Sequence, residues 1–193
     1  MIETNTQSPG LGQTLFKYRD YTPIPLILIV LLVAKPSVFT ATLGMIVLTF
    51  GELFRIYSVA FIGSISRTRK ESLGDQLISS GPFKWVRNPL YLGNFFIVLG
   101  LAIYSGVLWF CILTAVLFYL QYHFIVQYEE SLLGKKFGNE YESYKAAVPA
   151  WFPNSLPKLS DFEWPSSFTQ SLRSEKRTLS AIAAMLILLI LCS

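Results

Sequence analysis

Two short polar stretches, separated by an apolar run, carry the side chains best suited to chemistry. The first runs from Gly81 to Gly93 and places a cation and an amide, Arg87 and Asn88, directly before the apolar residues. The second is the carboxylate pair Glu129-Glu130. Arginine binds carboxylates and glutamate binds cations through charge-assisted hydrogen bonds. Together these residue types can hold a ligand that carries charges of both signs.

The apolar run between the two stretches predicts an antiparallel helical hairpin. Its arms cover residues 89–104 and 107–128 and join at Ser105-Gly106, with no charge at the turn. Because the arms are of similar length, the hairpin returns Arg87 and the glutamate pair to the same side of a membrane. The predicted site is therefore a pocket at the membrane border that faces the cytosol.

The composition favours an integral membrane protein. Hydrophobic residues make up 52% of the 193 residues, which is high for a soluble domain of this size. Cys111 and Cys192 lie in separate apolar runs and suggest no disulfide framework. His123 has no second ligand at a suitable spacing, so no metal site is expected. The net charge of +4 comes from basic residues that border apolar spans, so nucleic acid is not an expected partner.

We expect an all-α fold with about five transmembrane helices in a single domain over residues 1–193. Its parts are a polar N-terminal tail or short surface helix (1–20), two spans (21–63), a catalytic core (64–155) that contains the hairpin 89–128, and an interfacial segment with a last apolar helix (156–193). For the first apolar run, a signal-peptide core is the alternative. The last run, 178–192, is short for a crossing; we expect a fifth span there, and an amphipathic or tilted anchor is the alternative.

The basic residues predict the orientation of this fold. With five spans, Lys17, Arg19, the loop 67–87 and the region 135–177 fall on one side of the membrane, and the other side receives Lys35. The positive-inside rule then places the N-terminus and both long loops in the cytosol.

A second charged pair lies inside the predicted span 37–63. Glu52 and Arg55 are three residues apart and share one helical face. Charged side chains at membrane depth are costly unless they pair or face a polar cavity. The pair is either a structural ion pair or part of a pocket wall that contacts the substrate.

Two sequence blocks flank the predicted hairpin at a characteristic separation. They are Gly81-Pro82-Phe83-x-x-x-Arg87-Asn88-Pro89-x-Tyr91-x-Gly93 and Glu129-Glu130-x-x-Leu133-x-x-x-Phe137-Gly138-x-x-Tyr141-x-x-Tyr144-x-x-x-Val148-Pro149. This pattern resembles the isoprenylcysteine carboxyl methyltransferase family and its phospholipid methyltransferase relatives, over roughly residues 50–155. The resemblance implies an all-helical membrane enzyme that uses S-adenosylmethionine, with the cofactor entering from the cytosol and a lipophilic acceptor entering from the bilayer.

The resemblance also implies which positions hold the methyl donor. By position these are Asp75, Gln76, Leu77, Ile78, Phe83, Asn88, Pro89, Leu90, Tyr91 and Glu129, with Thr68 near another donor contact. Asn88 stands where the family usually has a histidine. Asparagine can still form hydrogen bonds at this position, but it cannot gain or lose a proton as histidine can. Ile125 stands where eukaryotic members have an arginine that contacts the prenylcysteine substrate.

The chemistry of these residues agrees with such a donor. The two glutamates suit the positive groups of S-adenosylmethionine, Arg87 and Asn88 suit its carboxylate, and an apolar set suits the adenine: Leu77, Ile78, Phe83 and Tyr91. We expect Arg87 and Glu130 to be catalytic and Glu52 and Arg55 to contact the substrate. Arg55 suits a carboxylate acceptor, whereas Glu52 or Glu130 would take the proton of a lipid amine.

The expected function is methyl transfer from S-adenosylmethionine to a lipophilic acceptor at the cytosolic membrane face. Carboxyl O-methylation of an isoprenylcysteine-type acceptor is the first expectation, and phospholipid amine N-methylation, which Ile125 favours, is the alternative. A non-catalytic membrane scaffold or lipid-binding protein is the third reading. The expected partners are the lipophilic substrate and membrane lipids, in a bacterial inner membrane or a membrane of the endoplasmic reticulum type.

Overall fold

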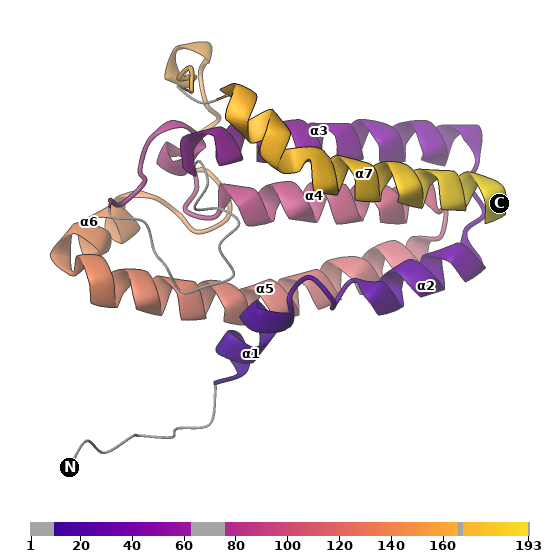
Figure 1. Ribbon diagram of the computed structural model, residues 1–193, viewed down its shortest axis with the longest axis horizontal. Coiled ribbons are helices and arrows are strands. Elements are labelled where there is room, and N and C mark those ends of the chain that lie inside the picture. Colours follow the sequence, from indigo (N-terminus) through magenta and orange to yellow (C-terminus); the bar gives the residue numbers. More distant parts are fainter. Residues whose placement is uncertain (1–9, 63–75, 166–167, 193) are drawn as a thin grey trace.

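The computed structural model is a bundle of helices (Figure 1) and describes residues 10–62, 76–165 and 168–192. Over these ranges the chain forms helices and no strands. The elements are α1 (Leu11–Tyr18), α2 (Ile24–Val33), α3 (Val38–Ile62), the 3-10 helix η2 (Gly81–Lys84), α4 (Pro89–Tyr104), α5 (Leu108–Phe137), α6 (Asn139–Ala147), the 3-10 helix η3 (Leu159–Asp161) and α7 (Phe168–Cys192). The all-helical fold expected from the sequence is confirmed.

Helices α3 and α4 pack backbone against backbone. Each contributes two glycines to the contact. A Cβ atom added at Gly44 would lie 2.6 Å from the carbonyl oxygen of Gly100, and one added at Gly51 would lie 2.9 Å from that of Gly93. Glycines at these positions let two membrane helices approach more closely than any side chain allows. The contact also sets Arg55, one turn beyond Gly51, against the first turns of α4.

The remaining helices surround this pair (Figure 1). Helix α7 runs along α3, and α5 contacts α4 and carries α1 on its surface. Gly12 brings α1 onto α5, because a Cβ atom there would lie 2.6 Å from the carbonyl oxygen of Phe124. Buried residues of α5 form a hydrophobic cluster at this contact: Phe118, Tyr122 and Ile125. Partly buried side chains from other segments pack against them: Leu15, Phe16, Tyr91, Phe95 and Trp151. This packing places α1 over the polar end of the bundle.

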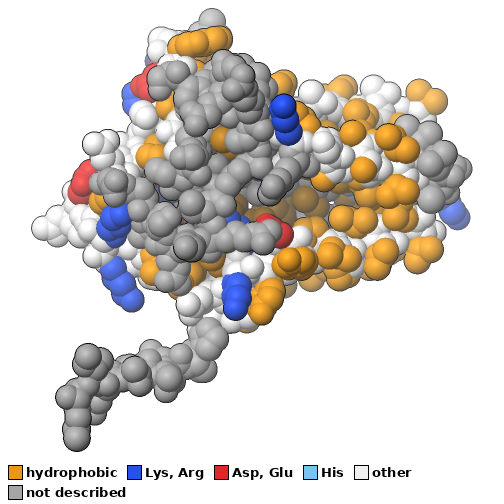
Figure 2. Space-filling view, in the orientation of Figure 1, with side chains coloured by type: hydrophobic (Ala, Val, Ile, Leu, Met, Phe, Trp, Pro, Cys, Tyr) orange, Lys and Arg blue, Asp and Glu red, His pale blue; other side chains and the backbone are white. Residues whose placement is uncertain are grey.

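Two helices, α3 and α5, are long and apolar enough to cross a membrane, and three shorter apolar stretches accompany them: Ile24–Val33, Pro89–Tyr104 and Thr178–Leu189. Figure 2 shows hydrophobic side chains crowded over the right half of the molecule, whereas most of the charged side chains in view lie toward the other half. Large apolar side chains remain on the surface, including Val38 at 87% and Leu32 at 86% exposure. An apolar surface of this extent indicates contact with lipid.

The helix boundaries agree with the sequence-based expectation at some ends and differ at others. Helix α4 spans the predicted arm 89–104. The second arm was predicted to end at residue 128, but α5 continues to Phe137, so Glu129 and Glu130 lie inside a helix. The helix ends only at Gly138, whose φ of +54° favours glycine. Likewise, α7 begins at Phe168, before the apolar run predicted at 178–192.

Candidate functional site

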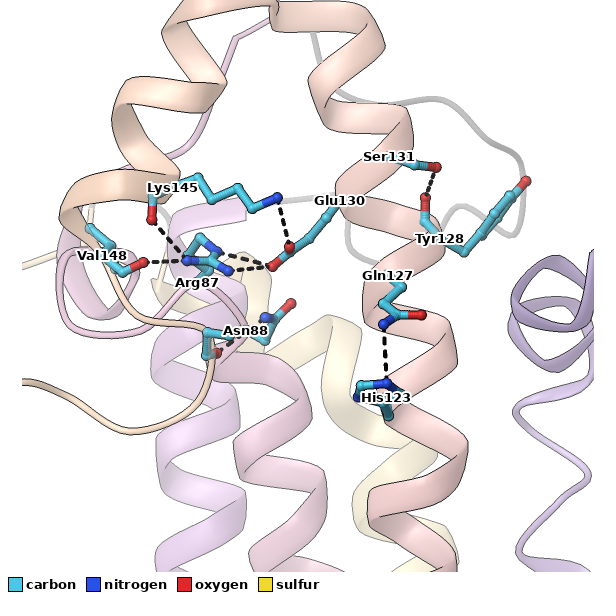
Figure 3. Close-up of polar contacts among 10 residues, drawn as sticks. Arg87, Asn88, His123, Gln127, Tyr128, Glu130, Ser131, Lys145 and Val148 are labelled. Carbon is cyan, nitrogen blue, oxygen red and sulfur yellow. Dashed lines mark hydrogen bonds and ion pairs between the residues drawn. The ribbon is translucent and has the colours of Figure 1, made fainter.

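Arg87 is the centre of a hydrogen-bond cluster that ties the start of α4 to α5 and to the segment after α6 (Figure 3). Its Nη2 and Nε atoms lie 2.9 Å and 3.0 Å from Glu130 Oε1. Its Nη1 atom donates to the carbonyl oxygens of Val148, at 2.5 Å, and Lys145, at 3.1 Å. The Arg87 and Glu130 side chains are only 11% and 14% exposed. The expected catalytic pair is therefore a largely buried ion pair.

Further contacts join the same two segments. The Arg87 backbone N–H donates to the Pro149 carbonyl at 2.8 Å, and Asn88 Nδ2 donates to the Ala150 carbonyl at 3.1 Å. The Tyr144 hydroxyl donates to the Phe83 carbonyl at 2.8 Å. Residues 144–150 therefore fix the conformation of the Gly81–Gly93 stretch, and they engage the Asn88 side chain.

Two tyrosines of α6 lie beside this cluster. Burial and the nearby Glu130 carboxylate together raise the pKa of the Tyr141 hydroxyl to about 12. Burial also raises the pKa of Tyr144. Both phenols are therefore neutral at physiological pH, and neither serves as a base.

Glu129 belongs to a second cluster. The Tyr91 hydroxyl hydrogen-bonds to its carboxylate, and Arg19 Nη1 lies 4.0 Å from its Oε1 atom. Arg19, which directly follows α1, also lies over the ring of Phe16, 4.2 Å from the centroid. From the sequence, Arg19 is expected only on the cytosolic side of the membrane, because nothing local links it to a residue more than a hundred positions away.

Polar side chains continue from Glu129 into the bundle. The rings of Tyr91 and Tyr122 pack with centroids 4.7 Å apart. The Tyr122 hydroxyl hydrogen-bonds with the Asn94 side chain and interacts electrostatically with Arg55. Helices α3, α4 and α5 thus contribute to one polar path, with Glu129 at one end and Arg55 at the other.

Glu52 and Arg55 form an ion pair, one of the two readings that the sequence leaves open, with 3.4 Å between Arg55 Nε and Glu52 Oε2. Arg55 Nη2 also donates to Thr178 Oγ1 of α7 at 2.6 Å. The other carboxylate oxygen, Glu52 Oε1, is buried and has no hydrogen-bond partner in the described part of the chain. The substrate-binding role of this pair stays a prediction.

The other residues expected to contact the donor lie in several places. Leu77 and Ile78 are half-buried and Gln76 is exposed, in the segment before η2. Phe83 and Pro89 are buried, and Leu90 is half-buried. Asp75 and Thr68 lie outside the described residues. Ile125 is fully buried at 0% exposure in the aromatic cluster, so this position contributes no polar contact.

A cavity of about 430 Å³ opens between α5 and α6 beside Glu130. Its lining carries charges of both signs: Gln127, Glu130, Ser131, Gly134, Lys135, Glu142 and Lys145. The Lys145 ammonium, 3.8 Å from Glu130 Oε2, connects the cavity to the Arg87 cluster (Figure 3). Among the residues that the structure describes, no three His, Cys, Asp or Glu side chains are grouped to hold a metal ion.

The fold and its buried charged clusters define a helical membrane protein with polar sites at one end of the bundle. The chain belongs to the phospholipid methyltransferase family, whose model matches residues 39–140, more than half of the chain. The match includes α4 and α5 in full and all of α3 except Val38. It therefore includes both members of the Arg87–Glu130, Tyr91–Glu129 and Glu52–Arg55 contacts.

Two curated relatives are similar over most of the chain. The first is the nickel-cobalt-cadmium resistance protein NccN of Alcaligenes xylosoxydans xylosoxydans, 28% identical over 139 residues, which cover 72% of this chain and 60% of that protein. The second is the cobalt-zinc-cadmium resistance protein CzcN of Cupriavidus metallidurans, 29% identical over 139 residues, or 72% of this chain and 59% of that protein. The chain thus spans about three fifths of the length of the curated relatives it matches.

Replacing Arg87 is expected to destabilise the fold. Arg87→Ala removes the closest partner of the buried Glu130 carboxylate and leaves it only the more distant Lys145 ammonium. Breaking a buried ion pair costs about 3 kcal/mol or more. Melting temperature in detergent measures the effect, and Lys84→Ala, which breaks the exposed ion pair with Glu163, is the control with little expected change. An Arg87→Ala protein that melts like the wild type would show that the cluster does not hold these segments together.

Proposed function

We propose that the protein transfers a methyl group from S-adenosylmethionine to a lipophilic acceptor at the cytosolic face of a membrane. The observation that carries this proposal is the family match over α3, α4 and α5, the helices that supply Glu52, Tyr91 and Glu129. S-adenosylmethionine supplies an activated methyl group, so the chain's own task is to bind, orient and exclude water.

The proposed topology has five spans, formed by α2, α3, α4, α5 and α7, with the N-terminus in the cytosol. Arg19, Lys84 and Arg87 belong to the end of the bundle that also holds Glu129 and Glu130, and Lys35 is at the opposite end, where its backbone N–H donates to the Ser105 carbonyl. The positive-inside rule supports this orientation. The catalytic core is residues 64–155 of a single domain, in a bacterial inner membrane or one of the endoplasmic reticulum type.

For the donor site, we propose that Glu129 holds the positive groups of S-adenosylmethionine. Tyr91 supports this role because its hydroxyl orients the Glu129 carboxylate. Leu77, Ile78 and Phe83 would cover the adenine from the segment before α4. Asn88, Pro89 and Leu90 would also contact the donor, and the hydrogen bonds of Arg87 hold these three residues in place. Arg19, whose Nη1 atom lies 4.0 Å from Glu129 Oε1, is the cation that the positive groups of the ligand would displace from this carboxylate.

The first proposed acceptor is an isoprenylcysteine-type carboxylate, which would be O-methylated. A carboxylate is ionised at neutral pH and needs no general base. Arg55, largely buried in α3, is the cation that would hold it. On this reading Arg87 and Glu130 act by keeping the α4 start in place beside the donor.

The second proposed acceptor is a phospholipid amine, which would be N-methylated. The specific observation in its favour is Glu52 Oε1, a buried carboxylate oxygen with no hydrogen-bond partner in the described chain. Such an oxygen suits an ammonium headgroup and is placed to accept the proton that an amine loses before methylation. The buried, apolar Ile125 also favours this acceptor, since the arginine used for prenylcysteine in eukaryotic members is absent.

Transfer of an isotopically labelled methyl group tests the proposal. The purified protein, in nanodiscs that contain an amine phospholipid or a prenylcysteine analogue, is incubated with labelled S-adenosylmethionine. Label in the lipid extract supports methyl transfer, and mild alkali releases it from a methyl ester but not from an N-methyl group. A fold-competent protein that labels neither acceptor, and no lipid of its native membrane, would favour the non-catalytic scaffold.

A further inference from the structure

Thr178 of α7 contacts the predicted substrate pair although it lies beyond the region that matches the family model, residues 39–140. Its hydroxyl accepts a hydrogen bond from Arg55 Nη2 at 2.6 Å. The contact between Arg55 Nε and Glu52 Oε2 is longer, at 3.4 Å. The guanidinium is therefore held more tightly toward α7 than toward its own ion-pair partner.

This geometry leaves one oxygen of Glu52 unused. A guanidinium commonly binds a carboxylate through two parallel hydrogen bonds, one to each oxygen. Here Glu52 Oε1 is buried and accepts no hydrogen bond from the described residues, and the Glu52 side chain is only 7% exposed. A buried acceptor without a partner costs free energy, so a fold that keeps one calls for an explanation.

We propose that Thr178 is a positioning residue for the acceptor site. It draws the Arg55 guanidinium away from Glu52 Oε1, and this oxygen thereby stays available for a headgroup that donates a hydrogen bond or carries a positive charge. The inference rests on the second proposed acceptor, a phospholipid amine, and makes α7 a part of the site.

The position of the pair supports this assignment. Arg55 interacts with Tyr122, and the packing of Tyr122 on Tyr91 leads to Glu129, the proposed donor contact. A headgroup at Glu52 would therefore lie at the opposite end of the same polar path from the donor. Helix α7 packs along α3 at this level, so the acceptor would meet α7 on its way in from the lipid.

Lipid binding by Thr178 variants tests the inference. The probes are phosphatidylethanolamine and phosphatidylglycerol with matched acyl chains, titrated into the detergent-purified protein and followed by native mass spectrometry. The wild type is expected to prefer the amine lipid. Thr178→Val, which keeps the shape but removes the hydroxyl, should reduce that preference about fivefold, the effect of one ordinary hydrogen bond. Thr178→Ser should retain it.

Two controls separate this inference from a structural role and from the proposed function. Thr42→Val makes the same change at an exposed site of α3, where the hydroxyl bonds only the Val38 carbonyl, and should keep the preference. S-adenosylhomocysteine binding should be equal in all variants, and its absence from the wild type would contradict the methyltransferase proposal instead. A wild type without amine preference, a Thr178→Val protein that keeps it, or a Thr178→Ser protein that loses it would overturn the role of Thr178.

Discussion

Gly100→Ala is expected to destabilise the protein strongly, because Gly100 lies in the close backbone contact between α3 and α4. The new Cβ atom would lie 2.5 Å from the Leu48 backbone nitrogen and 2.7 Å from the Gly44 carbonyl oxygen. Both atoms belong to backbone, which cannot rotate away as a flexible side chain can. Separating α3 from α4 to relieve the overlap should cost about 3 kcal/mol or more, at the upper end of the range for overpacking.

Gly134→Ala provides the matched control. This glycine also lies inside a helix, α5, but its added Cβ atom would meet its nearest neighbour, Glu142 Oε1, at 3.7 Å, an ordinary van der Waals contact. Alanine should stabilise that helix by up to about 1 kcal/mol through its higher helix propensity. Melting temperatures of both variants in the same detergent measure the difference. Equal behaviour of the two would mean that α3 and α4 are not packed as closely as described.

Glu129→Gln is expected to weaken binding of S-adenosylmethionine by about tenfold or more, since it removes a charge-assisted contact from a cationic ligand. The change preserves shape and still allows the Tyr91 hydroxyl to donate to the amide oxygen. The folded state should therefore persist, and the loss should appear in binding rather than in stability. Calorimetric titration measures it.

Glu140→Gln serves as the control for this effect. It neutralises an exposed carboxylate of α6 in the same polar region. It therefore changes the net charge of the protein by the same amount as Glu129→Gln. Its donor affinity should equal that of the wild type. Equal weakening in both variants would assign the effect to net charge, and no weakening in Glu129→Gln would remove Glu129 from the donor site.

The parts of the fold that local signals determine were predictable from the sequence. Helix α4 begins at Pro89 and ends near the Ser105-Gly106 turn, and both signals are contained in a few residues. The predicted end of α5, at residue 128, was wrong, because a change from apolar to polar residues marks the edge of a membrane and not the end of a helix. Gly138 was the local signal for that end, since its positive φ terminates the helix.

The candidate site was predictable only in part. Placing Arg87 and Glu130 at one end of a hairpin follows from arm lengths, but their direct pairing depends on how α5 turns about its axis. The hydrogen bonds from Arg87 to the carbonyls of Lys145 and Val148 depend on where α6 and the residues after it lie. The contacts of Arg19 and Thr178 could not be predicted locally, because each residue meets its partner across more than a hundred residues of sequence.

Calorimetric titration of S-adenosylhomocysteine into the detergent-purified protein is the most direct test of whether the polar end of this bundle binds S-adenosylmethionine. Saturable binding is expected in the wild type; it should be lost or strongly weakened in Glu129→Gln and retained in Thr178→Val. Absence of binding to a wild-type protein that melts cooperatively would rule out the proposed donor site and leave a membrane scaffold of the same family.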